Sequence, residues 1–106
     1  KLENLDYPNV DTIVPIANGG NEFGYIVANI LDIPHDNIIP IRYSRLKAGD
    51  ERVYLPRIFS DKINGLDSVL VVDDVSFTGK SLNKVKSFLS KRNINAENSL
   101  VILKLI

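Results

Sequence analysis

Strand-like and helix-like patterns alternate twice along this chain of 106 residues, in the same order each time. Each unit has an apolar strand, a glycine-containing turn, a helix with one apolar face and a further strand. The predicted strands and helices lie, in chain order, at residues 11–17, 22–31, 38–43, 68–73, 81–92 and 99–106. Strands separated by helices pair in parallel through right-handed crossovers, so the sequence predicts an open α/β sheet.

The simplest arrangement of these four strands is a doubly wound, mostly parallel sheet in the order 2-1-3-4, with helices on both faces. The first and third strands are then central neighbours whose helices leave to opposite faces. A crevice opens at their carboxyl ends, where the strand order reverses. We therefore expect the turn Asn18-Gly19-Gly20 and the turn at residues 74–80 to meet at one ligand.

Pro15 interrupts the first predicted strand, because it removes an amide donor where a central strand would use one. Two alternatives follow from this. Either the strand ends at Val14, or the chain bends at Pro15 and so aims the loop that follows.

Residues 45–62 fit neither the helical nor the strand period, and they carry basic residues beside Gly49 and Pro56. We expect a long basic loop here, with a short ribbon at residues 53–55 as a variant of it. Loops of this length in compact domains are usually functional lids or disordered segments. A solvated surface excursion is the alternative.

The composition limits what the chain can bind. Thirteen basic residues balance thirteen acidic ones, and this zero net charge provides no general attraction for nucleic acid or anionic lipid. We therefore expect no nucleic-acid or membrane partner. The absence of cysteine excludes disulfides and thiolate metal sites, and fits a cytoplasmic location. We expect a single domain over residues 1–106 that is truncated at one or both ends, since the chain begins with Lys1 and ends inside an apolar run.

Two adjacent acids, Asp73 and Asp74, follow the third predicted strand, and Thr78 and Gly79 precede the second long helix. The free amides at a helix start, with the positive end of its dipole, can hold a phosphate. Carboxylates repel phosphate, so we expect the two acids to accept hydrogen bonds from sugar hydroxyls or to hold a divalent cation through water. Together these groups describe a site for a phosphorylated ribose.

Gly79-Lys80-Ser81 also matches the end of a Walker A loop, but that motif requires glycine where this chain has Asp74. A capped helix after a core strand is the purely structural alternative for the segment. It gives no reason for two acids before a hydroxyl-glycine turn.

Residues 69–82 closely resemble the signature of type I phosphoribosyltransferases: four apolar residues, two acids, and a turn with Thr-Gly before a helix. The stretch Ile16-Ala17-Asn18-Gly19-Gly20 resembles the diphosphate-binding loop of the same family. The resemblance spans about residues 11–106 and implies a Rossmann-like core that binds 5-phosphoribosyl 1-diphosphate (PRPP) with Mg²⁺.

The resemblance also implies a role for each matching residue. The catalytic acids Asp73 and Asp74 would hold the ribose hydroxyls, with Mg²⁺ bound nearby through water rather than directly. The diphosphate would be bound by Ala17, Asn18 and Gly19. The residues that would hold the 5-phosphate are Ser76, Phe77, Thr78, Gly79, Lys80 and Ser81.

The activity implied by the resemblance is transfer of the phosphoribosyl group to a nitrogenous base, which yields a nucleoside monophosphate and diphosphate, as in nucleotide salvage. The basic stretch lies where the family has a mobile lid, so Arg45, Lys47 and Arg52 would help to neutralise the departing diphosphate. The resemblance also implies a homodimer.

Two residues depart from the family pattern. Phe77 stands where relatives that act on 6-oxopurines commonly have an acid, which disfavours hypoxanthine and guanine as acceptors. Asn18 replaces the Lys or Arg that is frequent in the diphosphate loop, and a neutral amide stabilises less charge. Both departures keep a second hypothesis open, a non-catalytic module that binds PRPP or a nucleotide and regulates a partner.

Overall fold

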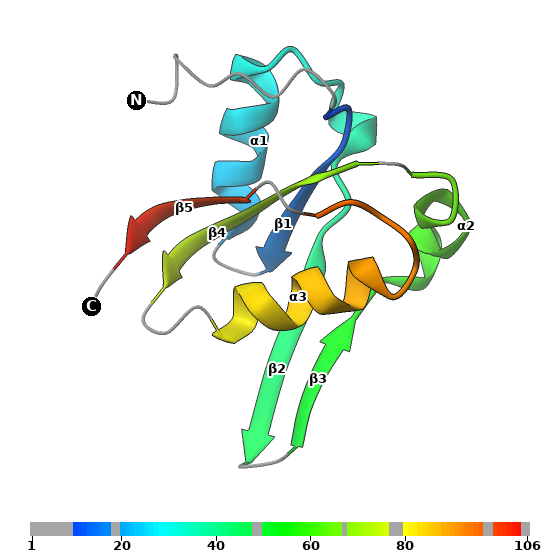
Figure 1. The fold of residues 1–106 in the computed structure, drawn as a ribbon. Helices are drawn as coiled ribbons and strands as arrows, with labels where there is room; N and C mark the ends of the chain where they lie inside the picture. Colours follow the sequence, from blue (N-terminus) through cyan, green and yellow to red (C-terminus); the bar gives the residue numbers. More distant parts are fainter. Residues whose placement is uncertain are drawn as a thin grey trace.

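A five-stranded sheet in the order β3-β2-β1-β4-β5 forms the centre of the protein in a computed structural model (Figure 1). The structure describes residues 10–17, 20–47, 50–66, 68–76, 80–96 and 99–104. The strands are β1 (Ile13–Ala17), β2 (Ile41–Lys47), β3 (Asp50–Tyr54), β4 (Leu70–Ser76) and β5 (Ser99–Lys104). The helices are α1 (Gly20–Ile30), α2 (Ser60–Ile63) and α3 (Lys80–Ser90), with 3-10 turns η2 (His35–Asn37) and η3 (Arg57–Phe59).

Four of the strands are parallel. β1 pairs with β2 on one side and β4 on the other, and β4 pairs with β5. These are the four strands expected from the sequence, in the expected order, so the doubly wound α/β prediction is confirmed. β3 adds an antiparallel strand at the edge beside β2, which makes the sheet mixed.

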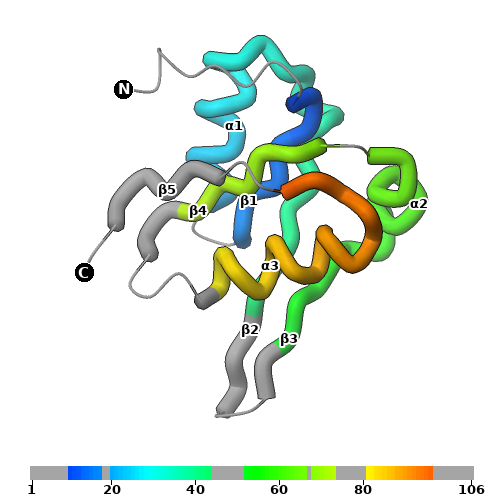
Figure 2. The backbone as a smooth tube through the Cα atoms, viewed as in Figure 1, coloured from blue at the N-terminus to red at the C-terminus, as the bar shows by residue number. Residues whose placement is uncertain are grey.

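The two long helices cover opposite faces of this sheet (Figure 2). On one face, Val27 of α1 packs with Leu70 and Val72, in a core cluster that also holds Ile13. On the other face, Val85 and Leu89 of α3 pack with a second cluster made from the alternate strand positions, Val14, Ile16, Val69 and Val71. Alternate residues of β1 and β4 face α1 and α3 in turn, so both central strands are buried on both sides. No helix in the described ranges is long and apolar enough to span a membrane.

Pro15 lies inside β1, which continues to Ala17, so the alternative that ends the strand at Val14 is wrong. β1 pairs with β4 only as far as Pro15, and Ile16 and Ala17 pair with β2 instead. A Cβ placed on Gly24 of α1 would lie 3.0 Å from Cβ of Pro15. The glycine therefore lets α1 pack closely on the strand at the position of the proline ring.

Residues 45–62 do not form the long loop that we expected. β2 continues to Lys47, β3 returns antiparallel to it, and η3 and α2 follow. The register pairs Arg45 with Glu51 and Lys47 with Asp50. Opposite charges at facing positions of two strands favour their pairing. The matching charges lie on different strands, so they produce no periodic pattern along either strand.

The third predicted strand was expected to end at Asp73, yet β4 continues to Ser76. Its partner β5 explains the difference, because Val75 pairs with Leu103 and Ser76 pairs with Lys104. Residues 74–76 of the predicted turn therefore belong to β4, and α3 already begins at Lys80.

Candidate functional site

The two central strands separate at their carboxyl ends. The ladder between β1 and β4 ends with the pair Pro15 and Val72. Beyond this pair, β1 continues along β2 and β4 continues along β5. The helices that follow these strands, α1 and α3, leave to opposite faces (Figure 1). This is the topological switch point at which open α/β sheets bind ligands.

Gly20 brings the start of α1 against β4. A Cβ on Gly20 would lie 2.7 Å from the carbonyl oxygen of Val72 and 3.6 Å from Cα of Asp73. Backbone atoms form this contact, so no side-chain rotation could make room for a larger residue. Gly20, the last residue of the first glycine turn, therefore lies directly beside Val72 and Asp73 of β4.

Asp73 is almost completely buried, with 4% of its surface exposed. Ser81, in the first turn of α3, donates a hydrogen bond from Oγ to Oδ2 of Asp73 at 3.3 Å. A buried carboxylate requires such donors, because an unpaired charge is costly away from water. The bond also joins the two ends of residues 74–80 and fixes where α3 starts relative to β4.

Arg42 is a candidate residue that the sequence reasoning missed. It lies on β2 directly opposite Ala17, the last residue of β1, and its side chain is exposed. Its neighbours Ile41 and Tyr43 pack into the cluster under α3, so strand alternation places Arg42 on the α1 face of the sheet. The register thus places Arg42 opposite Ala17, within the segment predicted to bind diphosphate, and that segment contains no Lys or Arg.

The structure describes some of the other predicted site residues only in part. Ala17 is half-buried at the end of β1. Asp74 and Ser76 belong to β4, and Lys80 is the first residue of α3. The predicted residues that fall outside the described ranges are Asn18, Gly19, Phe77, Thr78 and Gly79.

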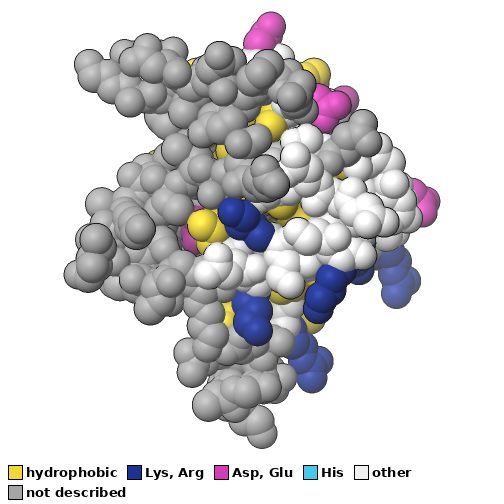
Figure 3. Space-filling model, viewed as in Figure 1, with side chains coloured by type: hydrophobic (Ala, Val, Ile, Leu, Met, Phe, Trp, Pro, Cys, Tyr) yellow, Lys and Arg dark blue, Asp and Glu magenta, His cyan; other side chains and the backbone are white. Residues whose placement is uncertain are grey.

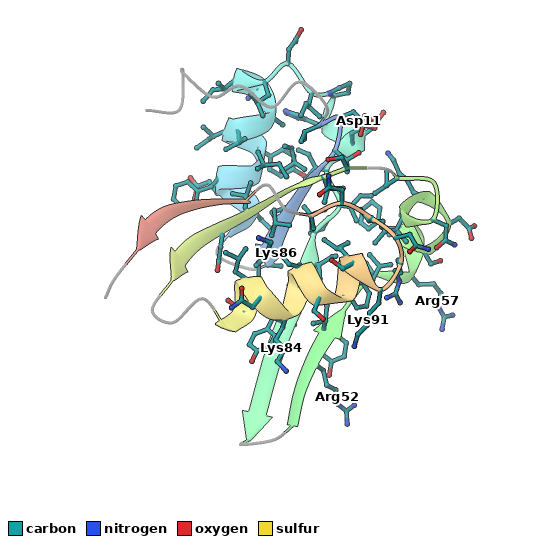
Figure 4. The ribbon with its side chains drawn as sticks, viewed as in Figure 1. Asp11, Arg52, Arg57, Lys84, Lys86 and Lys91 are labelled. Atoms are coloured by element: carbon teal, nitrogen blue, oxygen red, sulfur yellow. The ribbon has the colours of Figure 1, made fainter. Side chains whose placement is uncertain are left out.

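The three residues expected on a lid lie on the edge hairpin instead of a loop. Arg45 and Lys47 belong to β2, and Arg52, whose side chain is exposed, belongs to β3 (Figure 4). The hairpin carries them on paired backbone, because Arg45 faces Glu51 and Arg52 faces Ser44 in the register.

The described residues contain no group of three or more His, Asp or Glu side chains placed to hold a metal ion. At the switch point, β4 carries the adjacent acids Asp73 and Asp74, of which the structure describes the side chain of Asp73. Oxygen donors suit a hard cation such as Mg²⁺, which keeps several water ligands and needs only one or two carboxylates. The donor chemistry therefore fits Mg²⁺ held through water, and does not provide a complete protein cage.

A family model, the phosphoribosyl transferase domain, matches residues 2–103 of this chain. The chain belongs to this family. The resemblance inferred from the sequence is thereby confirmed, and it covers almost the whole chain. No curated protein sequence matches the chain significantly.

Solved structures of phosphoribosyltransferases share the fold. An orotate phosphoribosyltransferase from Aeropyrum pernix is 24% identical with a TM-score of 0.62, and the match covers 90% of this chain and 49% of that one. A purine phosphoribosyltransferase from Pyrococcus horikoshii is 26% identical with a TM-score of 0.63, covering 90% and 60%. An adenine phosphoribosyltransferase from Rhodothermus marinus is 16% identical with a TM-score of 0.71, covering 98% and 74%. The chain thus spans about half to three fifths of the first two enzymes.

Proposed function

We propose that this phosphoribosyltransferase-family chain transfers the 5-phosphoribosyl group of PRPP to a nitrogenous base and releases diphosphate. One observation carries the proposal: the switch point brings the start of α1, the start of α3 and the carboxylate of Asp73 together at neighbouring strands. Two helix starts with an acid between them suit a ligand that has phosphate at both ends and hydroxyls in the middle.

The 5-phosphate is assigned to the start of α3. Amide groups at a helix start have no partner within the helix, and the dipole favours an anion there. The Ser81 hydroxyl already donates to Asp73. Ser81 therefore contributes to phosphate binding by holding α3 in place and by offering its backbone amide to the phosphate. The remaining donors of this cradle are assigned to residues 76–80.

The ribose is assigned to the acidic pair. Asp73 and Asp74 can accept hydrogen bonds from the two ring hydroxyls, as a carboxylate has about four acceptor positions. Ser81 donates to one oxygen of Asp73, Oδ2. The same acids would hold Mg²⁺ through water, and the bound ion would supply a charge that bridges the ribose and the diphosphate.

The diphosphate is assigned to Ala17, Asn18 and Gly19 together with Arg42. Asn18 donates only a neutral amide, while the guanidinium of Arg42 from the neighbouring strand adds the charge that this loop lacks. A fixed cation beside the leaving group stabilises the negative charge that develops as the bond to the sugar breaks. Further neutralisation comes from Arg45, Lys47 and Arg52 if the hairpin closes over the site.

The reaction needs little covalent work from the protein. The bond from the sugar to the diphosphate breaks through an oxocarbenium-like transition state, and the ring nitrogen of the base forms the new bond with inversion and gives up its proton to water or to the departing diphosphate. Positioning of both reactants and exclusion of water supply most of the acceleration. Phe77 provides no acid for a purine ring, so bases other than 6-oxopurines are the preferred acceptors.

The test is release of diphosphate when the full protein is mixed with PRPP, Mg²⁺ and adenine, orotate, hypoxanthine, guanine or uracil in turn. We expect turnover with at least one base other than hypoxanthine or guanine, and none for Asp74→Asn. Calorimetry with ribose 5-phosphate provides the second readout. Binding of ribose 5-phosphate without turnover on any base would favour the regulatory alternative, which Asn18 and Phe77 support. Absence of binding would contradict both the transferase and the regulatory hypothesis.

A further inference from the structure

The large hydrophobic side chains that the structure leaves exposed fall into two groups. Among the described residues, these side chains are Tyr25, Ile26 and Ile30 of α1, Tyr54 of β3 and Ile58 of η3. Tyr54 is 43% exposed and Ile58 is 83% exposed. Single exposed apolar residues are ordinary in proteins, whereas groups of them mark binding surfaces. Each group is therefore a candidate contact for another molecule.

The outer side of α1 combines apolar and acidic residues. The inner side of this helix packs on the central strands β1 and β4. We call the outer side the ridge, and its exposed residues are Glu22, Tyr25, Ile26, Asn29 and Ile30. Residues 2–41, which include α1, contain six acidic residues and no Lys or Arg. The ridge therefore suits an apolar partner that also carries basic groups.

Beside the ridge, the same face of the sheet is uncovered over β2 and β3. A helix is about 10 Å wide and strands lie about 4.8 Å apart, so α1 covers about two strands. Arg42 of β2 pairs with Tyr54 of β3, and both side chains are exposed. Val53 and Leu55 pack in the cluster under α3, so strand alternation places Tyr54, like Arg42, on the α1 face. We call this face of β2 and β3 the step, and it carries an aromatic ring and a cation.

The ridge and the step border each other. The edge of the Tyr25 ring lies against His35 of η2, the turn that leads to β2, so this flank of α1 faces the step. At the outer edge of the step, β3 is followed by η3 with the exposed Ile58. Residues 52–60 contain two basic residues and no acid. The step therefore suits an apolar partner that carries acidic groups, which is the chemistry of the ridge.

Within one molecule the ridge and the step lie side by side, so they cannot pack on each other. A two-fold axis parallel to α1 places the ridge of each copy on the step of the other, which is a self-complementary contact. The two α1 helices then lie next to each other between the two sheets, at a helix spacing of about 8–10 Å. A second copy of this chain thus covers both apolar groups and matches both charges.

We infer that the protein forms a two-fold dimer in which the ridge of each copy packs on the step of the other. In this dimer Ile26 approaches the partner's Tyr54, and Glu22 approaches the partner's Arg42. An apolar centre with charged groups around it is the usual composition of a protein interface. The contact assigns a surface to the homodimer that the family resemblance implies, and it is independent of the proposed catalytic activity.

Analytical ultracentrifugation of the full protein over a range of concentrations tests the dimer. We expect a species of twice 11.8 kDa that dissociates on dilution. Glu22→Lys and Arg42→Glu each convert both charge contacts of the dimer into like-charge contacts, and each should weaken the dimer about tenfold or more. An equimolar mixture of the two variants should restore the affinity, because both contacts of the mixed dimer again join opposite charges.

Lys91→Glu is the matched control for Arg42→Glu, because each variant reverses one exposed cation and the two lie on opposite faces of the sheet. Figure 3 shows basic side chains over the α3 face, and Figure 4 labels Lys91 there. We expect Lys91→Glu to keep the affinity of the dimer. Ile26→Ser changes no charge and should weaken the dimer, while circular dichroism shows that the variant stays folded.

Four results would overturn the inference. The first is a monomer at about 1 mM protein, and the second is equal weakening of the dimer by Lys91→Glu and Arg42→Glu. The third is a mixture of Glu22→Lys and Arg42→Glu that associates no better than either variant alone. The fourth is growth beyond two copies, because a two-fold contact closes at the dimer.

Discussion

The two strand-helix units of this protein attach their helices to the sheet in different ways. In the first unit, glycines let α1 approach the backbone, at Gly20 over Val72 and at Gly24 over Pro15. In the second unit, a side-chain hydrogen bond from Ser81 to the buried Asp73 fixes α3. One architecture thus places two helix starts through steric fit in one case and through polar pairing in the other.

The steric attachment predicts the largest loss of stability. Gly20→Ala places a Cβ 2.7 Å from a carbonyl oxygen, so α1 or β4 must shift, and overpacking of this kind costs about 1–3 kcal/mol. Urea unfolding measures this loss, and ribose 5-phosphate binding should fall with it. Gly24→Ala is the matched control, because its Cβ meets side-chain atoms of Pro15 at 3.0 Å and alanine favours a helix. Equal stability of both variants would contradict the steric account.

The polar attachment predicts an intermediate effect. Ser81→Ala removes the hydroxyl and leaves the buried Asp73 with one donor fewer, which costs about 1 kcal/mol of unfolding free energy. The double variant with Asp73→Asn should lose less than the sum of the two single losses, because both act on one hydrogen bond. A double-mutant cycle by urea unfolding measures this coupling. Additive losses would show that Ser81 and Asp73 act independently.

Arg42 predicts the smallest effect on stability and a separate effect on binding. Its side chain is exposed, so Arg42→Gln should leave the free energy of unfolding within about 0.5 kcal/mol of wild type. The variant should bind diphosphate about tenfold more weakly, since a charge-assisted hydrogen bond contributes about 1.5–3 kcal/mol. Calorimetry with diphosphate and with ribose 5-phosphate separates the two sites. Equal weakening of both ligands would remove Arg42 from the diphosphate site.

The sequence predicted the four parallel strands and their order because apolar runs and helical faces repeat along the chain. Of β3 it indicated only a short ribbon at residues 53–55, and it did not predict the full length of β4. The β3 strand depends on pairs across the hairpin, such as Arg45 with Glu51, and the end of β4 depends on pairing of Val75 with Leu103. A periodic pattern within one segment does not show which residue of another strand each of these residues pairs with.

In the candidate site, too, the sequence revealed the residues of local motifs and not those that depend on contacts between strands. The acids Asp73 and Asp74 and the glycine turns were apparent as local motifs. Arg42 was not, because its proximity to Ala17 depends on the register between two parallel strands. The burial of Asp73 was also hidden, although the alternation of Val69, Val71 and Asp73 toward the face that α3 covers is a signal that could have indicated it.

We propose that the starts of α1 and α3 and the acid between them bind one phosphorylated ribose. The most direct test is an NMR titration of the isotope-labelled protein with ribose 5-phosphate, in which each backbone amide reports its own surroundings. We expect the largest shifts at residues 73–82, with smaller shifts at residues 17–21. Shifts confined to the hairpin or to the far end of α3, or no shifts at all, would contradict this proposal.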